Sequence, residues 1–258
     1  MSIANLVINV QDLERSVNFY RRHLSAEIVE RDEARCLLDL VTTTIELRTA
    51  ADLAANPWEQ DDAVRGFRHI GFKVADVDLI ARGLENDGVE MRVPPHENDQ
   101  MNVRVCFFAD PDGVALELVE RHLKYHRVVN AAAVEAEYAE PTPVRPRFDH
   151  VGVSVADTEG AIARYEALGF TRTGWAKLGL RGELELDFLR AGRTIVELLS
   201  WADADRFPVV DPRARGFSAM EFDKRSDLFA EAAASTTLAD GRKVFIDPDG
   251  VPLASAAD

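Results

Sequence analysis

Cysteine is scarce in this chain: of 258 residues, only Cys36 and Cys106 carry a thiol. Two cysteines cannot supply the disulfide framework of a small secreted scaffold, and they fit a reducing compartment such as the cytoplasm. Each lies in an apolar stretch, so we expect both to be inert thiols of the hydrophobic core.

Long apolar runs are also missing. No stretch of about 18 apolar residues occurs, so we expect no transmembrane helix. The first residues lack a basic segment followed by an apolar one, so we expect no secretory signal peptide. Together with the cysteine content, these features predict a cytoplasmic protein.

Basic residues are outnumbered, with 30 lysines and arginines against 45 acidic residues and a formal net charge of −15. Binding to a nucleic acid or an anionic membrane surface needs clustered basic side chains, so we expect neither partner. The rest of the composition is that of an ordinary globular protein with one large or two ordinary domains. We therefore expect a small-molecule partner, and a monomer or homodimer.

An internal repeat is the main positive feature of the chain. Residues 69–76 (HIGFKVAD) resemble residues 150–157 (HVGVSVAD), and a fainter copy, residues 5–12, opens the sequence. Each copy is an alternating apolar strand that ends in an aspartate, a residue type preferred at a helix N-cap. After the first copy, one apolar helical stripe is formed by Leu13, Val17, Tyr20 and Leu24. Each copy therefore predicts a strand followed by a helix.

A fourth copy shows at its two ends. Residues 215–217 match residues 65–67. Residues 247–251 match residues 110–114, and both carry Asp-Pro-Asp-Gly, which predicts a tight turn before a last strand. The interval between the two matches is shorter in the fourth copy, so we expect its helix and following strand to be truncated.

The repeat unit is predicted to be strand–helix–strand–strand–strand, which makes the fold class α+β. Four βαβββ modules span about residues 1–50, 66–121, 147–202 and 214–258. Residues 122–146 form a linker whose first part predicts a helix and whose proline-rich end predicts an extended segment. In chain order this gives an N-terminal domain, 1–121, and a C-terminal domain, 147–258.

Glu117 and Glu197 each lie in the middle of an apolar strand. A buried carboxylate is costly unless it is paired or bound to a metal. Strand alternation places Leu116 and Leu118 on one face and Glu117 on the other, so this glutamate faces the concave side if the leucines meet the helices. The other interpretation is an exposed sheet face, where charge is ordinary.

His69 and His150 open apolar strands and precede these glutamates by 48 and 47 residues. One histidine at a strand start is usually structural, but two modules with matched His and Glu positions indicate a shared site. Imidazole and carboxylate ligands suit Zn, Ni, Co, Mn or Fe. We therefore predict a divalent metal site made of His69, Glu117, His150 and Glu197.

The other two modules differ at these positions. The first has Asn5 in the histidine position and Glu46 in the glutamate position. The fourth has Ala219 and Ala254, which cannot bind a metal. We therefore expect the fourth module to be structural.

Four such modules, with His in the first strand and Glu in the last, resemble the vicinal oxygen chelate superfamily of glyoxalases, epimerases, extradiol dioxygenases and drug-resistance proteins. The resemblance covers nearly the whole chain. It implies that modules pair into two cupped half-barrels of mixed sheet, with a divalent metal that vicinal oxygens of the substrate chelate. In two-domain extradiol dioxygenases the ligands lie in the third and fourth modules, so the alanines of the fourth module exclude that arrangement here.

The pairing of the modules decides which residues share a site. If neighbours pair, the N-terminal site resembles that of glyoxalases with an amide ligand and consists of Asn5, Glu46, His69 and Glu117. If the inner modules pair, the set resembles bacterial-type glyoxalase I and consists of His69, Glu117, His150 and Glu197. We favour inner pairing because it brings the two complete His–Glu pairs together.

The resemblance implies an isomerase or lyase, in which the metal polarises a carbonyl and stabilises an enediolate while Glu117 or Glu197 shuttles the proton. One alternative is an Fe(II) dioxygenase that uses His69, Glu117 and His150. Another is a metal-free protein that sequesters a drug or metabolite.

Four further residues are weaker candidates. His122 and His126 lie four apart on a predicted helix without a third ligand, which favours a solvated linker. His96 lies in a predicted loop that could border the cavity. Arg104 lies on a predicted strand and could bind a substrate carboxylate or phosphate.

Overall fold

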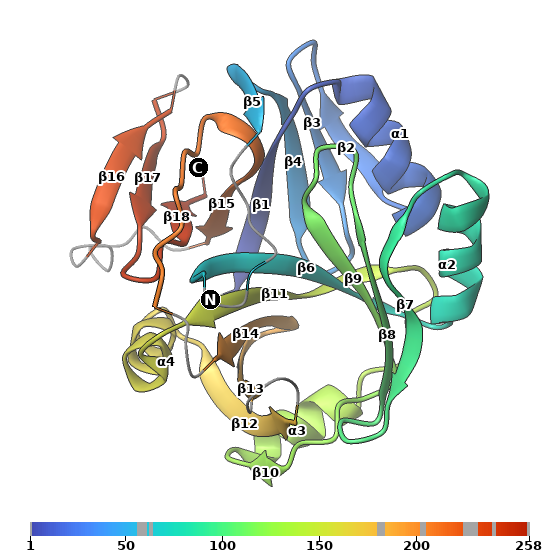
Figure 1. Ribbon diagram of the computed structural model, residues 1–258, viewed down its shortest axis with the longest axis vertical. Helices are drawn as coiled ribbons and strands as arrows, with labels where there is room; N and C mark the ends of the chain where they lie inside the picture. Colours follow the sequence, from blue (N-terminus) through green and yellow to red (C-terminus); the bar gives the residue numbers. More distant parts are fainter. Residues whose placement is uncertain are drawn as a thin grey trace.

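The computed structural model describes residues 2–55, 61, 64–179, 184–201, 205–223, 232–238 and 241–256. Within these ranges the chain forms four helices and two nine-stranded mixed sheets (Figure 1). The first module contains β1 (Ile3–Val10), α1 (Leu13–Leu24), β2 (Glu27–Arg31), β3 (Arg35–Asp39) and β4 (Thr44–Thr49), and β5 (Asp52–Ala55) follows it. The second contains β6 (Gly66–Val74), α2 (Val77–Asn86), β7 (Met91–Asn98), β8 (Val103–Ala109) and β9 (Ala115–Glu120).

The second half of the chain repeats this order. The linker contains β10 (Arg127–Val128) and α3 (Ala131–Tyr138). The third module contains β11 (Arg147–Val155), α4 (Thr158–Ala167), β12 (Thr171–Leu178), β13 (Leu184–Ala191) and β14 (Thr194–Ser200). The fourth contains β15 (Ala214–Phe222), β16 (Ala234–Thr237), β17 (Lys243–Ile246) and β18 (Pro252–Ser255).

The predicted βαβββ order is thus confirmed in the first three modules. In the fourth, β16 has four residues, whereas β7 and β12 have eight each. This confirms the predicted truncation of that strand. The predicted shortening of the helix falls on residues 224–231, which lie outside the described residues.

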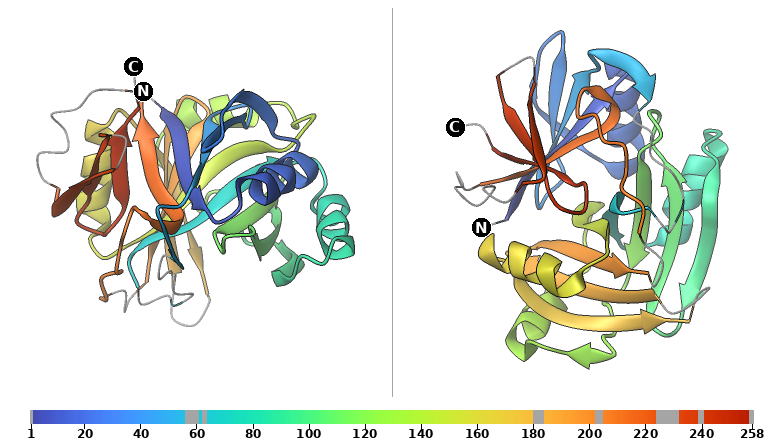
Figure 2. Two further views of the ribbon diagram at one scale, coloured as in Figure 1. Left: turned by 90° about the horizontal axis from the view of Figure 1, so that it is seen from above. Right: turned by 60° about the vertical axis from the view of Figure 1, so that its left-hand side comes forward.

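One sheet unites the two inner modules of the chain, and the other sheet unites the two outer modules. The inner sheet has the strand order β10-β12-β13-β14-β11-β6-β9-β8-β7 and unites the second and third modules. The outer sheet has the order β16-β17-β18-β15-β1-β4-β3-β2, with β5 beside β15, and unites the first and fourth (Figure 2). Inner pairing is therefore confirmed. The sequential boundaries 1–121 and 147–258 do not coincide with the sheets, because each sheet takes strands from both halves of the chain.

Each sheet is built around an antiparallel pair of first strands. In the inner sheet β6 pairs with β11, and Ile70 lies opposite Val151. In the outer sheet β1 pairs with β15, and Leu6 lies opposite Met220. Each first strand also runs parallel to the last strand of its own module, as β6 does with β9 and β11 with β14. The two modules of a sheet are therefore related by an approximate twofold axis.

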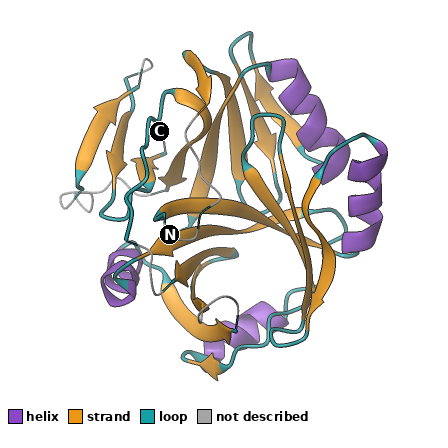
Figure 3. Cartoon of the chain, in the orientation of Figure 1, coloured by secondary structure: helices purple, strands orange, loops and turns teal. Residues whose placement is uncertain are grey.

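The helices α1, α2 and α4 begin where the sequence predicts and cover the outer faces of the sheets (Figure 3). The side chains of Asp12, Asp76 and Asp157 each accept a hydrogen bond from the backbone N–H three residues later. The apolar stripe of α1 packs into the core, and its fully buried members are Val17, Tyr20 and Leu24. The hydrophobic contact between helix and sheet thus leaves the concave faces free for other side chains.

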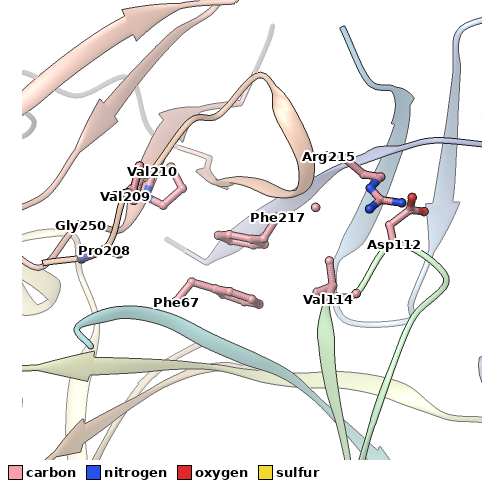
Figure 4. Close-up of a pocket in the computed structure, with 12 residues that line it drawn as sticks. Phe67, Asp112, Val114, Pro208, Val209, Val210, Arg215, Phe217 and Gly250 are labelled. Atoms are coloured by element: carbon pink, nitrogen blue, oxygen red, sulfur yellow. The ribbon is translucent and has the colours of Figure 1, made fainter. Parts of the chain in front are cut away.

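The contacts that join the sheets to each other include two at motifs of the repeat. The Asp-Pro-Asp-Gly segment of the second module forms the predicted tight turn, and its Asp110 accepts a hydrogen bond from the Tyr20 hydroxyl of α1 at 2.9 Å. Phe67 on β6 and Phe217 on β15 stack with their ring centroids 3.9 Å apart, beside a small cavity of about 60 Å³ (Figure 4). These two phenylalanines occupy equivalent positions in the second and fourth modules.

The two cysteines are free and buried, as expected. Burial raises the pKa of the Cys36 thiol, and it raises that of Cys106 to about 12. Both groups are therefore protonated and inert at neutral pH. Among the described helices, none is long and apolar enough to cross a membrane.

Candidate metal centre

Four side chains meet on the concave face of the inner sheet. His69 lies on β6, Glu117 on β9, His150 on β11 and Glu197 on β14. Their exposed fractions are only 6–8%, so the interpretation of the glutamates as residues of a solvated face is wrong. The two leucines that flank Glu117 are fully buried in the core on the helix side, as strand alternation predicts.

The register of β6 and β11 brings the two histidines close together. His69 lies opposite Gly152, and His150 lies opposite Gly71. A Cβ atom on Gly71 would lie 2.1 Å from the His150 ring, and one on Gly152 would lie 2.3 Å from the His69 ring. Each module therefore supplies one histidine, together with the glycine over which the histidine of the other module lies.

The four side chains converge through single atoms. His150 Nε2 lies 2.9 Å from Glu117 Oε2 and 3.6 Å from Glu197 Oε2. His69 Nε2 lies 3.3 and 3.2 Å from the same two oxygens, and the two Nε2 atoms are 3.0 Å apart. Ligand atoms bound at about 2.0–2.2 Å in tetrahedral or octahedral geometry are about 2.8–3.6 Å from their neighbours. The spacings between the imidazole nitrogens and the carboxylate oxygens match edges of such a coordination shell, but the group whose ligand atoms all lie within 4.8 Å of one another is His69, Glu117 and His150, without Glu197.

A further carboxylate orients His150. Its Nδ1 lies 3.2 Å from Asp149 Oδ2, and Arg147 NH1 lies 3.1 Å from Asp149 Oδ1. Burial alone would raise the pKa of Asp149, but Lys73, His150 and Arg147 hold it well below its ordinary value. An ionised Asp149 accepts a hydrogen bond from a proton on Nδ1 of His150 and so orients Nε2 toward the centre. Metal-binding histidines are oriented in this way.

The charges at the centre favour a cation. Burial alone would raise the pKa of Glu117, but its hydrogen bonds to the two imidazoles lower it to about 2. Burial alone would lower the pKa values of His69 and His150, but the neighbouring carboxylates raise both. The site therefore holds an ionised carboxylate and attracts positive charge, whether as protons or as a metal ion.

A cleft of about 360 Å³ opens on one side of the centre, and His69, Glu117 and Glu197 line it. Alternate residues continue the concave face along the strands. Residue 115 of β9 lines this cleft, and so do residues 199 and 201, which follow Glu197. Three of the four clustered side chains therefore form part of the cleft wall.

A second cavity, of about 50 Å³, lies on the other side of the centre and also touches Glu117 and Glu197. The linker contributes Tyr125 and Glu137 to its wall, and the Tyr125 hydroxyl donates to Glu137 Oε2 at 2.6 Å. The linker lies beside β12 at one edge of the inner sheet, where β10 pairs with β12 (Figure 1).

The alternative set from neighbour pairing is not assembled. Asn5 and Glu46 lie on β1 and β4 of the outer sheet, away from the strands that carry His69 and Glu117. Ala219 and Ala254 also lie in the outer sheet, where they join a small apolar cluster.

The weaker candidates have mixed outcomes. His96 borders the cleft as predicted, but it lies on β7 and not in a loop. Arg104 is not among the residues that line the cleft, because its guanidinium binds Asp78 of α2 at 2.6 and 2.7 Å. The helix predicted over His122 and His126 is wrong, since β10 first pairs with β12 and α3 begins only at residue 131.

Sequence reasoning missed the two glycines and Asp149. A signal for the glycines was present, because both repeats share His-x-Gly, but only the paired register shows what the glycine does. Asp149 has no counterpart in the second module, where Arg68 stands at the equivalent position. The repeat therefore gave no signal for it.

The structure combines tandem βαβββ modules with a cluster of histidines and glutamates on the concave face of one sheet, beside a cleft. The chain belongs to the glyoxalase/bleomycin resistance protein/dioxygenase superfamily, whose family model matches residues 2–118.

Relatives in sequence match about half of the chain, and solved structures match its fold. The uncharacterized protein YraH of Bacillus subtilis is 30% identical over 124 residues, which cover 46% of this chain and 97% of that protein. The metallothiol transferase FosB of Lysinibacillus sphaericus is 24% identical over 119 residues, which cover 45% of this chain and 79% of that protein. Glyoxalase I from Zea mays shares the fold, with a TM-score of 0.63 and 19% identity over 97% of this chain and 90% of that one.

Proposed function

We propose that this protein is a divalent-metal-dependent enzyme of the vicinal oxygen chelate type, an isomerase or lyase that acts on a small substrate with vicinal oxygens. One observation carries the proposal: beside a cleft, each of two imidazole nitrogens lies 2.9–3.6 Å from each of two carboxylate oxygens. The proposed ligands are His69, Glu117, His150 and Glu197. The relationship to FosB, which is named a metallothiol transferase, supports a role for metal.

The donor set fits a divalent metal better than a set of direct hydrogen bonds. The two Nε2 atoms face each other at 3.0 Å, so protons on both would repel. The Nδ1 atom of His150 is already hydrogen-bonded to Asp149. A divalent cation bound to all four atoms would compensate both carboxylates and use both nitrogen lone pairs.

When bound, the ion would supply Lewis-acid polarisation of a substrate oxygen. The chain's own residues would hold and move the proton. Glu117 and Glu197 contact the imidazoles through Oε2, so Oε1 is the oxygen available for proton transfer. The apolar walls of the cleft would exclude water from the reacting atoms.

A second candidate is an Fe(II) dioxygenase. It is favoured by the ligand atoms of His69, Glu117 and His150, which all lie within 4.8 Å of one another and form a two-histidine, one-carboxylate set. Oxygen uptake by the iron-loaded protein would separate this candidate from the isomerase or lyase.

The test is metal content. Protein purified without added metal is reconstituted separately with Ni, Zn, Mn, Co and Fe(II), dialysed, and measured by elemental analysis. We expect about one ion per chain with at least one of these metals. If none is retained at that ratio, the enzymatic proposal is wrong, and a metal-free binding protein becomes the better explanation.

A further inference from the structure

The cleft beside the proposed metal centre has two apolar walls. On one side stand Val103, Val105 and Phe107, which are alternate residues of β8 and therefore share its concave face. On the other side Leu186 of β13 lies opposite Leu199 of β14 in the sheet register. Both walls belong to one apolar cluster of the inner sheet.

The apolar surface begins directly at the ligand atoms. Phe107 is the cross-strand partner of Glu117, and its ring meets the His69 ring edge-on with centroids 5.6 Å apart. On the opposite wall, Leu199 follows Glu197 at the next position of the same face. Any group attached next to a chelating oxygen pair must therefore lie against aromatic or aliphatic side chains.

We propose that the substrate carries its vicinal oxygen pair directly on an aromatic or branched aliphatic body, which lies between β8 and the β13–β14 wall. This rests on the proposed function, because it places the oxygen pair at the four-residue centre. The cleft is also lined by polar residues such as Arg92, His96 and Asn98, but a hydrophilic group held directly between the two apolar walls would lose water without gaining hydrogen bonds from them, which is costly. An apolar body gains about 25 cal/mol for each Å² of surface it buries.

The experiment uses the Co(II)-loaded protein and two hydroxamates as probes. Acetohydroxamate and benzohydroxamate present the same oxygen pair on a methyl and a phenyl group, and the visible spectrum of Co(II) reports their binding. We expect benzohydroxamate to bind at least about 10-fold more tightly, because the phenyl group buries more apolar surface. Titration of Co(II) in buffer gives the intrinsic preference of the ion, which is subtracted.

Two variants locate the effect. Leu199→Asn places an amide on the apolar wall and should remove most of the preference for phenyl, because it weakens benzohydroxamate binding more than acetohydroxamate binding. Leu79→Asn is the matched control, because Leu79 is 62% exposed on α2 and lies outside the cleft. If Leu199→Asn does not fold, Trp201→Ala, on the same face of the wall, replaces it.

The outcomes separate the two proposals. Equal affinity for both probes in a Co(II)-loaded protein, or a phenyl preference unchanged by the wall variant, overturns the substrate class and leaves the metal centre standing. Failure to bind Co(II) or any other divalent metal overturns the proposed function, and the substrate class with it.

Discussion

The inner and outer sheets share one topology and differ at their centres. Where the inner sheet has its His₂Glu₂ cluster, the outer sheet has a buried ion-pair network. Asn5 donates to Glu221 Oε2 at 2.9 Å, Arg242 NH1 lies 2.5 Å from Glu221 Oε1, and Arg242 NH2 lies 3.5 Å from Glu46 Oε1. Guanidinium groups thus compensate both buried carboxylates, because Glu46 is also paired with Arg48 and Arg35. We propose that a metal ion does the same in the inner sheet.

The two centres also differ in the residues that face each other across the central strands. The inner sheet pairs each histidine with a glycine. In the outer sheet Val7 lies opposite Ala219, and Glu221 lies opposite Asn5. Both glycine positions are therefore filled, and both histidines are absent. The difference teaches that a histidine and its opposite glycine act as one unit, because either replacement alone would spoil the ligand geometry.

The largest expected effect is on metal affinity, and it should arise from the inner sheet and not from the outer one. His150→Ala removes a ligand from the inner centre and should weaken metal binding by at least about 10³-fold, since each 1.4 kcal/mol is tenfold. Calorimetric titration of the apo protein with the metal that reconstitutes it best measures this loss.

Its control lies in the outer sheet. Glu46→Gln changes a carboxylate at the equivalent position of the first module, and metal affinity should stay within about twofold of the unmodified protein. Damage to metal binding by Glu46→Gln, with His150→Ala unaffected, would contradict the assignment of the centre to the inner sheet.

The next effect concerns stability: a change in the outer sheet should destabilise the protein but leave metal affinity unchanged. Arg242→Met removes the cation beside the buried Glu221, while Glu46 keeps Arg48 and Arg35, and should cost about 3–5 kcal/mol of unfolding free energy. Urea denaturation measures the cost. Metal affinity should be unchanged, and adding Glu221→Gln should restore part of the stability. A stable Arg242→Met protein would show that the network does not hold the outer centre together.

The module order, the helix starts and the pairing of the inner modules could be predicted from the chain. They depend on local alternation, on capping aspartates and on matched His and Glu positions, which are visible in the sequence. Asp149 and the cleft walls could not be predicted, because they depend on which strands become neighbours and how far the sheet curls. The interpretation of Arg104 as a substrate-binding residue failed for the same reason. Its guanidinium is paired with Asp78 across the helix–sheet contact, and nothing in the local sequence reveals that partner.

A smaller effect tests the roles of the two carboxylates within the inner centre. Glu117→Gln and Glu197→Gln should each reduce turnover by on the order of 10²-fold, the usual contribution of a general acid–base group. The assay follows exchange of the α-proton of 2-oxo and 2-hydroxy substrates in D₂O by NMR. The metal content of each variant is measured in parallel, so that a lost ion is distinguished from a lost base. Full activity in both variants would remove the proton-shuttle mechanism.

The smallest expected effect tests whether histidine and glycine act as a unit. Gly71→Ala places a Cβ atom 2.1 Å from the His150 ring, so the ring must move. The displacement should weaken metal binding by about 10-fold and cost about 1–3 kcal/mol of stability, as overpacking does. The matched change in the outer sheet is Val7→Ala, which removes buried methyl groups and should cost about 1–2 kcal/mol without any effect on metal affinity. Gly83→Ala, on α2 with open space around its Cβ position, controls for the substitution itself. If Gly71→Ala bound metal as tightly as Gly83→Ala, the glycine would not be part of the centre, and the two sheets would differ only in their ligands.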